Sequence, residues 1–204
     1  MHIYLVRHGE TIWNVEGRTQ GNLDIPLSNH GIKQSELLAE RIKREGISHI
    51  YTSDLTRASQ TSLIIGQKIG IQPEKIKELR EINLGVWQGC NKKEIEKDYP
   101  GQLKRYRFDT SFAPLGGETL DSLNDRVRRF IRALDLIKGN IEKKILIVSH
   151  AYPIRMLISE LLMIPLRYLW DMQLDNTGVS VVYWKHNEIS RLVCLNDICH
   201  LLSE

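Results

Sequence analysis

The sequence of 204 residues has no apolar stretch of about 18 residues, which excludes a membrane-spanning helix. It also has no run of five lysines or arginines, and its formal net charge is only +3, so its charge does not indicate a nucleic-acid binder. A strand-like segment begins at residue 2, so we expect no signal peptide. We therefore expect a cytoplasmic protein that binds neither a membrane nor nucleic acid.

Cysteine is scarce: Cys90, Cys194 and Cys199 form no CxxC pair and do not have the spacing of metal ligands. Free thiols in a reducing compartment are expected. Asp, Asn and His do not cluster as a catalytic metal site requires, so we expect no metal and no cofactor. Repeats, low-complexity tracts and flexible linkers are also missing, which indicates a single domain over residues 1–204.

Short segments rich in β-branched and aromatic residues alternate with segments of helical periodicity, which indicates an α/β fold. Strands are expected at 2–6, 49–53, 144–149, 178–184 and 188–195. Helices are expected at 29–45, 55–70, 120–139 and 153–163, with Ser28 as an N-cap and Gly70 after a helix end. The "ILIV" segment at 145–148 is apolar on both faces, as in a buried central strand. The expected architecture is a three-layer sandwich, with a mostly parallel central sheet and helices on both faces.

Two stretches fit this alternation less well. The last two strands are expected to form an antiparallel hairpin with His186 and Asn187 in its turn. Residues 91–140 are expected to form a helical or irregular insert, a lid over the site, of which 91–118 is the least regular part. A solvated helix face is expected for the arginines at 126, 128, 129 and 132.

Basic side chains follow three of the expected strands at the point where each strand ends. Arg7 and His8 follow the first strand. Arg57 follows the second, on the first turn of a helix, and His150 follows the third. If these strands are parallel neighbours, their carboxyl ends bring the four side chains together, where helix N-termini add positive partial charge. Such a cluster repels itself unless it holds an anion, and a phosphate monoester fits it. The alternative is that each strand simply ends at the surface.

Six motifs together resemble the histidine phosphatase (phosphoglycerate mutase-like) superfamily over nearly the whole chain. They are "RHGETIWN", "GRTQGNLDIPLSNHG", "TSDLTRASQT", "LREINLGVWQG", "GGET" and "VSHAYPIR". The resemblance implies that His8 is a nucleophile that becomes phosphohistidine, and that Glu81 donates and accepts protons. It also implies contacts to the phosphoryl oxygens from Arg7, Arg57 and His150, and further phosphate contacts from Asn14 and Gln20.

Four more residues belong to the predicted site. Gly21 is expected to bind phosphate, as is the backbone N–H of Ala151, which stands where the family often has glycine. Leu84 is expected on an apolar lip of the pocket. His200 is expected to return to the pocket edge and meet a substrate carboxylate, although a surface position at the end of the hairpin is an equal alternative.

The predicted roles are chemically consistent. A histidine nucleophile must be neutral, and nearby arginines disfavour its imidazolium form. Its other ring nitrogen is expected to donate to a backbone carbonyl, which fixes the tautomer. For Glu81, burial and the substrate dianion raise the pKa while arginines lower it, and we expect a protonated carboxyl with substrate bound. The other interpretations are ordinary turn residues for Asn14 and Gln20 and a charged surface turn around Glu81.

The substrate is left open. The mutases of the family carry a tyrosine near position 84 and an arginine pair in the insert, whereas here Leu84 is apolar and Tyr106 separates Arg105 from Arg107. This favours metal-independent hydrolysis of small phosphate monoesters, with a cofactor-dependent phosphoglycerate mutase as the alternative. The tail "LNDICHL" is similar to that of phosphoserine and α-ribazole phosphatases. The expected partner is a small phosphorylated metabolite, and a homodimer is left open.

Overall fold

A six-stranded sheet forms the centre of the computed structural model, which describes residues 1–136, 144–185 and 190–202. The strand order is β3-β2-β4-β1-β5-β6. In chain order the strands are β1 (His2–Arg7), β2 (His49–Thr52), β3 (Glu74–Lys75), β4 (Lys144–Ser149), β5 (Val179–Tyr183) and β6 (Arg191–Asp197). The first four are parallel, whereas β5 pairs antiparallel with β1 and β6 pairs antiparallel with β5. The expected mostly parallel sheet is confirmed, and β3 is a short strand that the sequence pattern did not indicate.

Alternating side chains along the strands fill two separate cores. On β1, Ile3 and Leu5 pack in one core, while Tyr4 and Val6 pack in the other. The "ILIV" segment of β4 divides in the same way, and each of its residues is at most 4% exposed. Strands with two buried faces need a layer of helices on each side.

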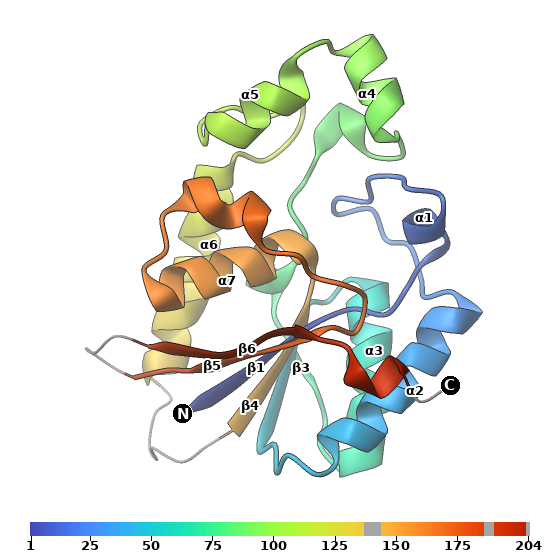
Figure 1. Ribbon diagram of the computed structural model, residues 1–204, viewed down its shortest axis with the longest axis vertical. Coiled ribbons are helices and arrows are strands. Elements are labelled where there is room, and N and C mark those ends of the chain that lie inside the picture. The colour runs from blue at the N-terminus through green and yellow to red at the C-terminus, as the bar shows by residue number, and fades with distance from the viewer. Residues whose placement is uncertain (137–143, 186–189, 203–204) are drawn as a thin grey trace.

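Helices cover both faces of the sheet, as Figure 1 shows. One layer contains α2 (Asn29–Ile42) and α3 (Thr56–Ile69), and the other contains α6 (Leu120–Leu136) and α7 (Ala151–Leu162). Ser28 begins α2 by accepting the N–H of Gly31 at 3.0 Å, and Gly70 ends α3 in the left-handed conformation, with φ 74°. The three-layer sandwich is therefore confirmed.

Two short helices, α4 (Lys92–Asp98) and α5 (Gln102–Phe108), lie at one end of the molecule in Figure 1. The sequence predicted a helical or irregular insert here, with 91–118 as its least regular part. Asn91 begins α4 with a capping box: its Oδ1 accepts the N–H of Glu94, whose carboxylate accepts the N–H of Asn91. By contrast, α6 packs into the core on the sheet. The division into a body and an insert over 91–140 stays a prediction, and 137–143 lie outside the described residues.

The remaining elements are short. They are α1 (Ile12–Val15) and the 3₁₀ helices η1 (Lys77–Leu79), η2 (Gly85–Trp87), η3 (Leu166–Asp171) and η4 (Cys199–Leu201). The predicted turn residues His186 and Asn187 lie outside the described residues. Within the part of the chain that the structure describes, no helix is both long enough and apolar enough to cross a membrane.

Candidate active site

His8 and His150 meet at the carboxyl ends of two paired strands. β1 and β4 are parallel neighbours, and the N–H of His8 donates to the carbonyl of Ser149 at 3.0 Å. The two imidazole rings lie 5.1 Å apart, and both residues are at most 3% exposed. The strand order therefore brings together two residues that are 142 positions apart in the sequence, 150 minus 8.

The surroundings of His8 select one tautomer and one charge state. Its Nδ1 lies 2.7 Å from the carbonyl oxygen of Gly9, so Nδ1 carries the proton and Nε2 keeps its lone pair. Burial, followed by the charges of Arg57 and Arg7, holds the pKa of His8 well below its ordinary value. The ring is therefore neutral, with a nucleophilic nitrogen directed away from its own backbone.

Arg57 is fully buried on the first turn of α3 and is held by three contacts. Its Nη2 donates to the carbonyl of Gly21 and its Nη1 to the carbonyl of Leu23, each at 2.7 Å. Its Nε donates to Nδ1 of His150 at 3.2 Å. Burial lowers the pKa of Arg57 to about 10, so the side chain stays protonated at neutral pH. A guanidinium has five N–H groups, so two remain for an anion.

Arg7 supplies a second guanidinium. One of its N–H groups, on Nη1, donates to the carbonyl of Leu174 at 2.7 Å, while its buried Nε has no partner among the described residues. Burial lowers the pKa of Arg7, and the carboxylate of Glu81 partly opposes this. A buried donor without a partner is unfavourable, and an oxyanion at this position would satisfy it.

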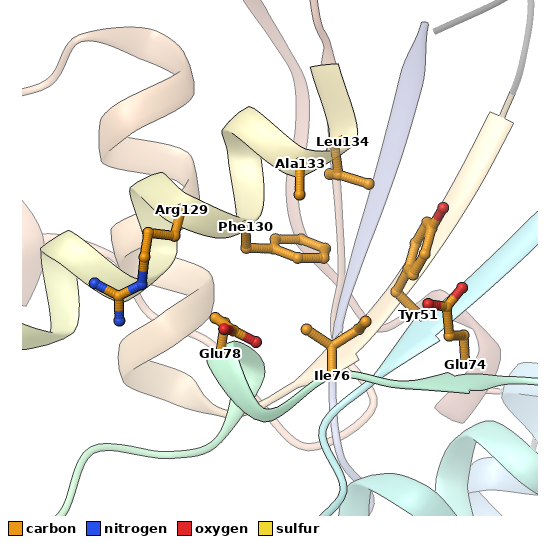
Figure 2. Close-up of a pocket in the computed structure, with 8 residues that line it drawn as sticks. All are labelled: Tyr51, Glu74, Ile76, Glu78, Arg129, Phe130, Ala133 and Leu134. Carbon is orange, nitrogen blue, oxygen red and sulfur yellow. The ribbon is translucent and has the colours of Figure 1, made fainter. Parts of the chain in front are cut away.

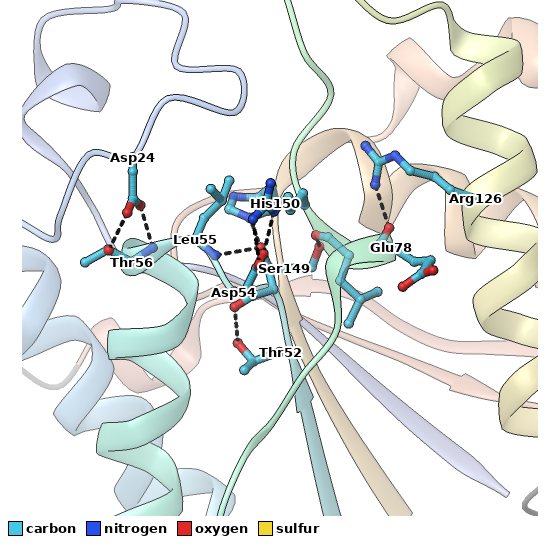
Figure 3. A network of polar contacts seen from close by, with 12 residues as sticks. Asp24, Thr52, Asp54, Leu55, Thr56, Glu78, Arg126, Ser149 and His150 are labelled. Carbon is cyan, nitrogen blue, oxygen red and sulfur yellow. Dashed lines mark hydrogen bonds and ion pairs between the residues drawn. The ribbon is translucent and has the colours of Figure 1, made fainter.

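Both nitrogens of His150 are engaged. Because Nδ1 accepts from Arg57, Nε2 carries the proton and donates to Oγ of Ser53 at 2.9 Å. Burial and Arg57 keep the pKa of His150 well below its usual value. Figure 3 shows His150 at the centre of this polar network. Contact with a phosphoryl oxygen requires Nε2–H to turn from Ser53 or to be shared with it.

Glu81 lies between η1 and η2, with its carboxylate at the start of α7. Its Oε1 accepts the N–H of Ile82 at 3.0 Å and of Tyr152 at 3.3 Å. Burial raises the pKa of Glu81, while the Ile82 N–H, Arg57 and Arg7 lower it in that order, and the upward effect dominates. A carboxyl with a raised pKa beside two cations is suited to giving and taking a proton.

The segment that carries Glu81 is tied to its neighbours on both sides. Nη1 of Arg126 donates to the carbonyl of Glu78 at 2.5 Å, as Figure 3 shows, and Oγ of Ser149 donates to that of Leu79 at 2.7 Å. Arg126 also forms an ion pair with Glu118 and is only 11% exposed in its side chain. The expected solvated face is therefore wrong for Arg126, which turns inward because these acceptors lie beside α6.

The loop after β1 contributes Asn14, Gln20 and Gly21. Oδ1 of Asn14 accepts both the N–H and the hydroxyl of Thr11 at 3.0 Å, which leaves Nδ2 as the group able to donate to phosphate. Gln20 is 8% exposed, and its Oε1 has no partner within the described ranges. Gly21 contributes its carbonyl to Arg57. The carboxylate of Asp24 accepts the N–H and hydroxyl of Thr56 and so joins this loop to α3 (Figure 3).

The other three predicted residues lie in different surroundings. Ala151 is the first residue of α7, next to His150. Leu84 is 4% exposed and packs in the core beside α6, so little of its side chain is free at a pocket lip. His200 is 8% exposed, and its Nε2 lies 3.0 Å from Oγ1 of Thr177. Direct substrate contacts from these residues stay predictions.

The family follows from the comparison of the whole chain with known proteins. The family model described as "Histidine phosphatase superfamily (branch 1)" matches residues 3–198. The chain belongs to this superfamily.

Three relatives illustrate the similarity. Phosphoserine phosphatase 1 of Hydrogenobacter thermophilus is 34% identical over 200 residues, which cover 98% of this chain and 93% of that protein. A probable phosphoglycerate mutase of Yersinia pestis is 34% identical over 189 residues, covering 92% of this chain and 86% of that protein. The solved structure of a mycobacterial glucosyl-3-phosphoglycerate phosphatase in complex with VO3 has a TM-score of 0.88 at 30% identity, over 96% of this chain and 98% of that one.

In this histidine phosphatase superfamily member, three residues near the site had no predicted role. Ser53 follows β2 as His150 follows β4, and this shared position at a strand end is the signal that could have indicated it. Tyr152 contacts Glu81 through its backbone, and Nδ2 of Asn176 donates to the carbonyl of His8 at 2.9 Å. Nothing in the local sequence marks Asn176, because its loop is distant from His8 along the chain.

A separate cavity of about 180 Å³ lies between α6 and residues 74–78, as Figure 2 shows. Its lining consists of Tyr51, Glu74, Ile76, Glu78, Arg129, Phe130, Ala133 and Leu134. None of the predicted site residues is among them, so this cavity is distinct from the candidate active site. Among the residues that the structure describes, no group of three or more His, Cys, Asp or Glu could hold a metal ion.

Proposed function

We propose that this member of the histidine phosphatase superfamily hydrolyses small phosphate monoesters without a metal ion, through a phosphohistidine on His8. The observation that carries the proposal is the hydrogen bond from Nδ1 of His8 to the Gly9 carbonyl, which leaves a neutral ring with its Nε2 lone pair beside two buried guanidinium groups. Two guanidiniums with unused N–H groups match the oxygens of a phosphoryl group.

In the first step, Nε2 of His8 attacks phosphorus while the bond from phosphorus to the ester oxygen breaks. The phosphoryl group passes to nitrogen, and the proton of Glu81 passes to the leaving oxygen. In the second step, Glu81 takes a proton from water as the water oxygen bonds to phosphorus and the nitrogen–phosphorus bond breaks. Phosphate leaves, and both side chains return to their starting states.

Arginines stabilise the charge that spreads over the phosphoryl oxygens during both steps. Arg57 keeps two N–H groups free after its contacts to Gly21, Leu23 and His150, and Arg7 keeps its Nε free. Because these donors are already oriented by backbone carbonyls, they need little rearrangement when phosphate binds. The second imidazole and the Nδ2 of Asn14 complete the proposed contacts.

Aromatic side chains support a closed pocket on the leaving-group side. Tyr106 of α5 packs 6.3 Å from Tyr152 and 6.0 Å from Trp170, measured between ring centroids. Burial, followed by the charge of Glu81, raises the pKa of Tyr152, whose backbone N–H donates to Glu81. Through Tyr106, α5 contacts the start of α7, which supports the proposed role of α4 and α5 as a lid over a small metabolite.

Relatives bear on the substrate only through their names. They include a phosphoserine phosphatase and a glucosyl-3-phosphoglycerate phosphatase, which support hydrolysis, and a probable phosphoglycerate mutase, which supports the alternative. Phosphoserine and α-ribazole phosphate remain the first substrates to test. The three cysteines are free thiols, which supports the proposed cytoplasmic location.

The decisive experiment measures phosphate release from p-nitrophenyl phosphate and from a panel of phosphorylated metabolites in excess chelator. Full activity is expected with the chelator, and no activity is expected for His8→Ala. The matched control is His30→Ala, since His30 is exposed and outside the site. Phosphate label on the protein should resist base, be lost in acid and map to His8.

Three results would oppose the proposal: loss of activity in chelator, turnover by His8→Ala, or a label at another residue.

A coupled assay with 3-phosphoglycerate tests the alternative function, a phosphoglycerate mutase. Interconversion with 2-phosphoglycerate that far outpaces phosphate release would identify a mutase.

A further inference from the structure

The segment after β6 contacts the loop that holds the end of β1, where His8 lies. β6 leads into η4, which places the buried His200 with its Nε2 3.0 Å from Oγ1 of Thr177. Thr177 lies just before β5, the neighbour of β1 in the sheet. Neither His200 nor Thr177 is among the phosphate contacts described above, so their hydrogen bond needs another explanation.

The direction of each hydrogen bond follows from the groups available. Oγ1 of Thr177 has one proton and donates it to the carbonyl of Asn176 at 2.7 Å, so it must accept from Nε2–H of His200. Nδ1 of His200 then carries a lone pair and faces Nη1 of Arg41 at 3.5 Å. Arg41 is held in turn by Asp197, whose Oδ2 lies 2.5 Å from its Nη2. The imidazole of His200 is therefore fixed from both sides.

Thr177 has an unusual backbone that this contact helps to hold. Its φ of 56° lies in the left-handed region, which is rare for a β-branched residue. In this conformation its N–H donates to the carbonyl of Arg7 at 2.9 Å and approaches that of His8 at 3.4 Å. The neighbouring Asn176 donates its Nδ2–H to the same carbonyl of His8 at 2.9 Å. Residues 176–177 thus hold the backbone carbonyls of Arg7 and His8 by hydrogen bonds.

The position of the His8 ring depends on this backbone. Nδ1 of His8 donates to the carbonyl of Gly9, which belongs to the 9–10 peptide group. The 8–9 peptide group, whose carbonyl accepts from Asn176, directly precedes it, so the backbone from residue 8 to residue 10 sets the direction of Nε2. A shift of the strand end would turn the lone pair away from phosphorus. Misplacing a reacting atom by about 1 Å can cost roughly 100-fold in rate.

We propose that His200 is a positioning residue: it holds Thr177 in the left-handed conformation that fixes the backbone of Arg7 and His8, and so aims the nucleophile. The proposal rests on the proposed function of His8. It differs from a direct contact between His200 and a substrate carboxylate, because the Nε2–H that would bind the carboxylate is already used by Thr177.

The test compares two variants that remove the hydrogen bond between His200 and Thr177, called the removing variants, with two conservative variants that keep it. His200→Ala and Thr177→Val remove the hydrogen bond, whereas His200→Gln keeps a donor near the position of Nε2 and Thr177→Ser keeps the hydroxyl. The exposed neighbour Cys199→Ser is the matched control. Each protein is assayed well below its unfolding temperature on p-nitrophenyl phosphate and on phosphoserine, with rapid quenching to measure phosphorylation of His8.

The removing variants should lower kcat about 10- to 100-fold on both substrates, with little change in KM. The conservative variants should recover most of the loss, and the double variant His200→Ala/Thr177→Val should lose no more than either single one. A rise in KM confined to phosphoserine, with kcat unchanged, would identify a substrate contact and overturn the proposal. Unchanged kcat on both substrates would overturn it as well.

A readout that does not depend on turnover separates this inference from the proposed function. The Nδ1–H proton of His8 should give a protected NMR signal in the wild-type protein because of its bond to Gly9. The signal should weaken in His200→Ala and persist in His200→Gln. If the wild-type protein shows no phosphatase activity, the proposed function fails, and this signal still decides whether His200 positions His8.

Discussion

Replacing Glu81 with glutamine should slow the phosphorylation of His8 by alkyl phosphates much more than its phosphorylation by p-nitrophenyl phosphate. An alkoxide is a strong base and leaves only when it receives a proton, whereas p-nitrophenolate leaves readily without one. Burial raises the pKa of Glu81, which supports its proposed role as the group that supplies a proton to the leaving oxygen. Glutamine has the same shape but cannot transfer that proton.

The expected size follows from the role of the proton and from the contacts that remain. General acid catalysis contributes about 10²- to 10⁴-fold, or about 3–5 kcal/mol of barrier lowering. The amide oxygen of glutamine can still accept the N–H groups of Ile82 and Tyr152, which now bond to Oε1 of Glu81. The loss should therefore reflect chemistry and not a displaced side chain.

Rapid-quench measurements on phosphoserine and p-nitrophenyl phosphate separate the two steps. For the variant, the nitrophenolate burst should form at close to the wild-type rate, and phosphoenzyme should then accumulate because water lacks its base. Phosphorylation by phosphoserine should be slow from the start. Glu74→Gln, at an exposed carboxylate, is the control and should match the wild type. Equal slowing of the first step on both substrates would refute the role of Glu81 as the acid.

Three further predictions concern the support of the site. Gly21→Ala would bring Cβ into the side chain of Gln88 at a φ of 53°, so denaturant unfolding should show a loss of about 1–3 kcal/mol, with a lower kcat because the carbonyl that holds Arg57 moves. Arg126→Met leaves the carbonyl of Glu78 without its donor and should cost about 1–3 kcal/mol by the same measurement. Because the pKa of His8 is lowered in the folded state, only the unfolded chain gains this proton as the pH falls below about 6.5, and stability falls with it. The free energy of unfolding from urea titrations at pH 7 to 5 should decline less steeply for His8→Asn, by up to about 1.4 kcal/mol per pH unit.

Much of the sheet was predictable because its strands are short, apolar and followed by polar residues. The buried "ILIV" segment indicated a central strand, and β4 does lie between β1 and β2. Parallel neighbours share an edge, so the basic residues after β1 and β4 had to approach each other. The fold class and the meeting of His8 with His150 therefore depend on patterns within a few residues of each strand.

Contacts between loops were less predictable because their partners lie far apart in the sequence. The pairing of Thr19 with residues 87–90 and of Arg57 with the carbonyls at 21 and 23 is decided by tertiary packing. Arg126 illustrates the same limit: its helical position resembles that of its exposed neighbours, and only the nearby Glu118 and Glu78 carbonyl turn it inward. The proposed role of residues 176–177, which hold the backbone of Arg7 and His8, likewise has no local signal.

Burial acts in opposite directions on the pKa values of Glu81 and His8, the two groups proposed to react, with a single consequence. It raises the pKa of Glu81 and lowers that of His8, so both groups favour their neutral forms. A neutral imidazole is the form that attacks phosphorus, and a protonated carboxyl is the form that serves the leaving oxygen. Arg57 and Arg7 lower the pKa of Glu81, but burial outweighs them. In the proposed second step, the carboxylate left by the first step takes a proton from water, so that one side chain would serve both halves of the reaction.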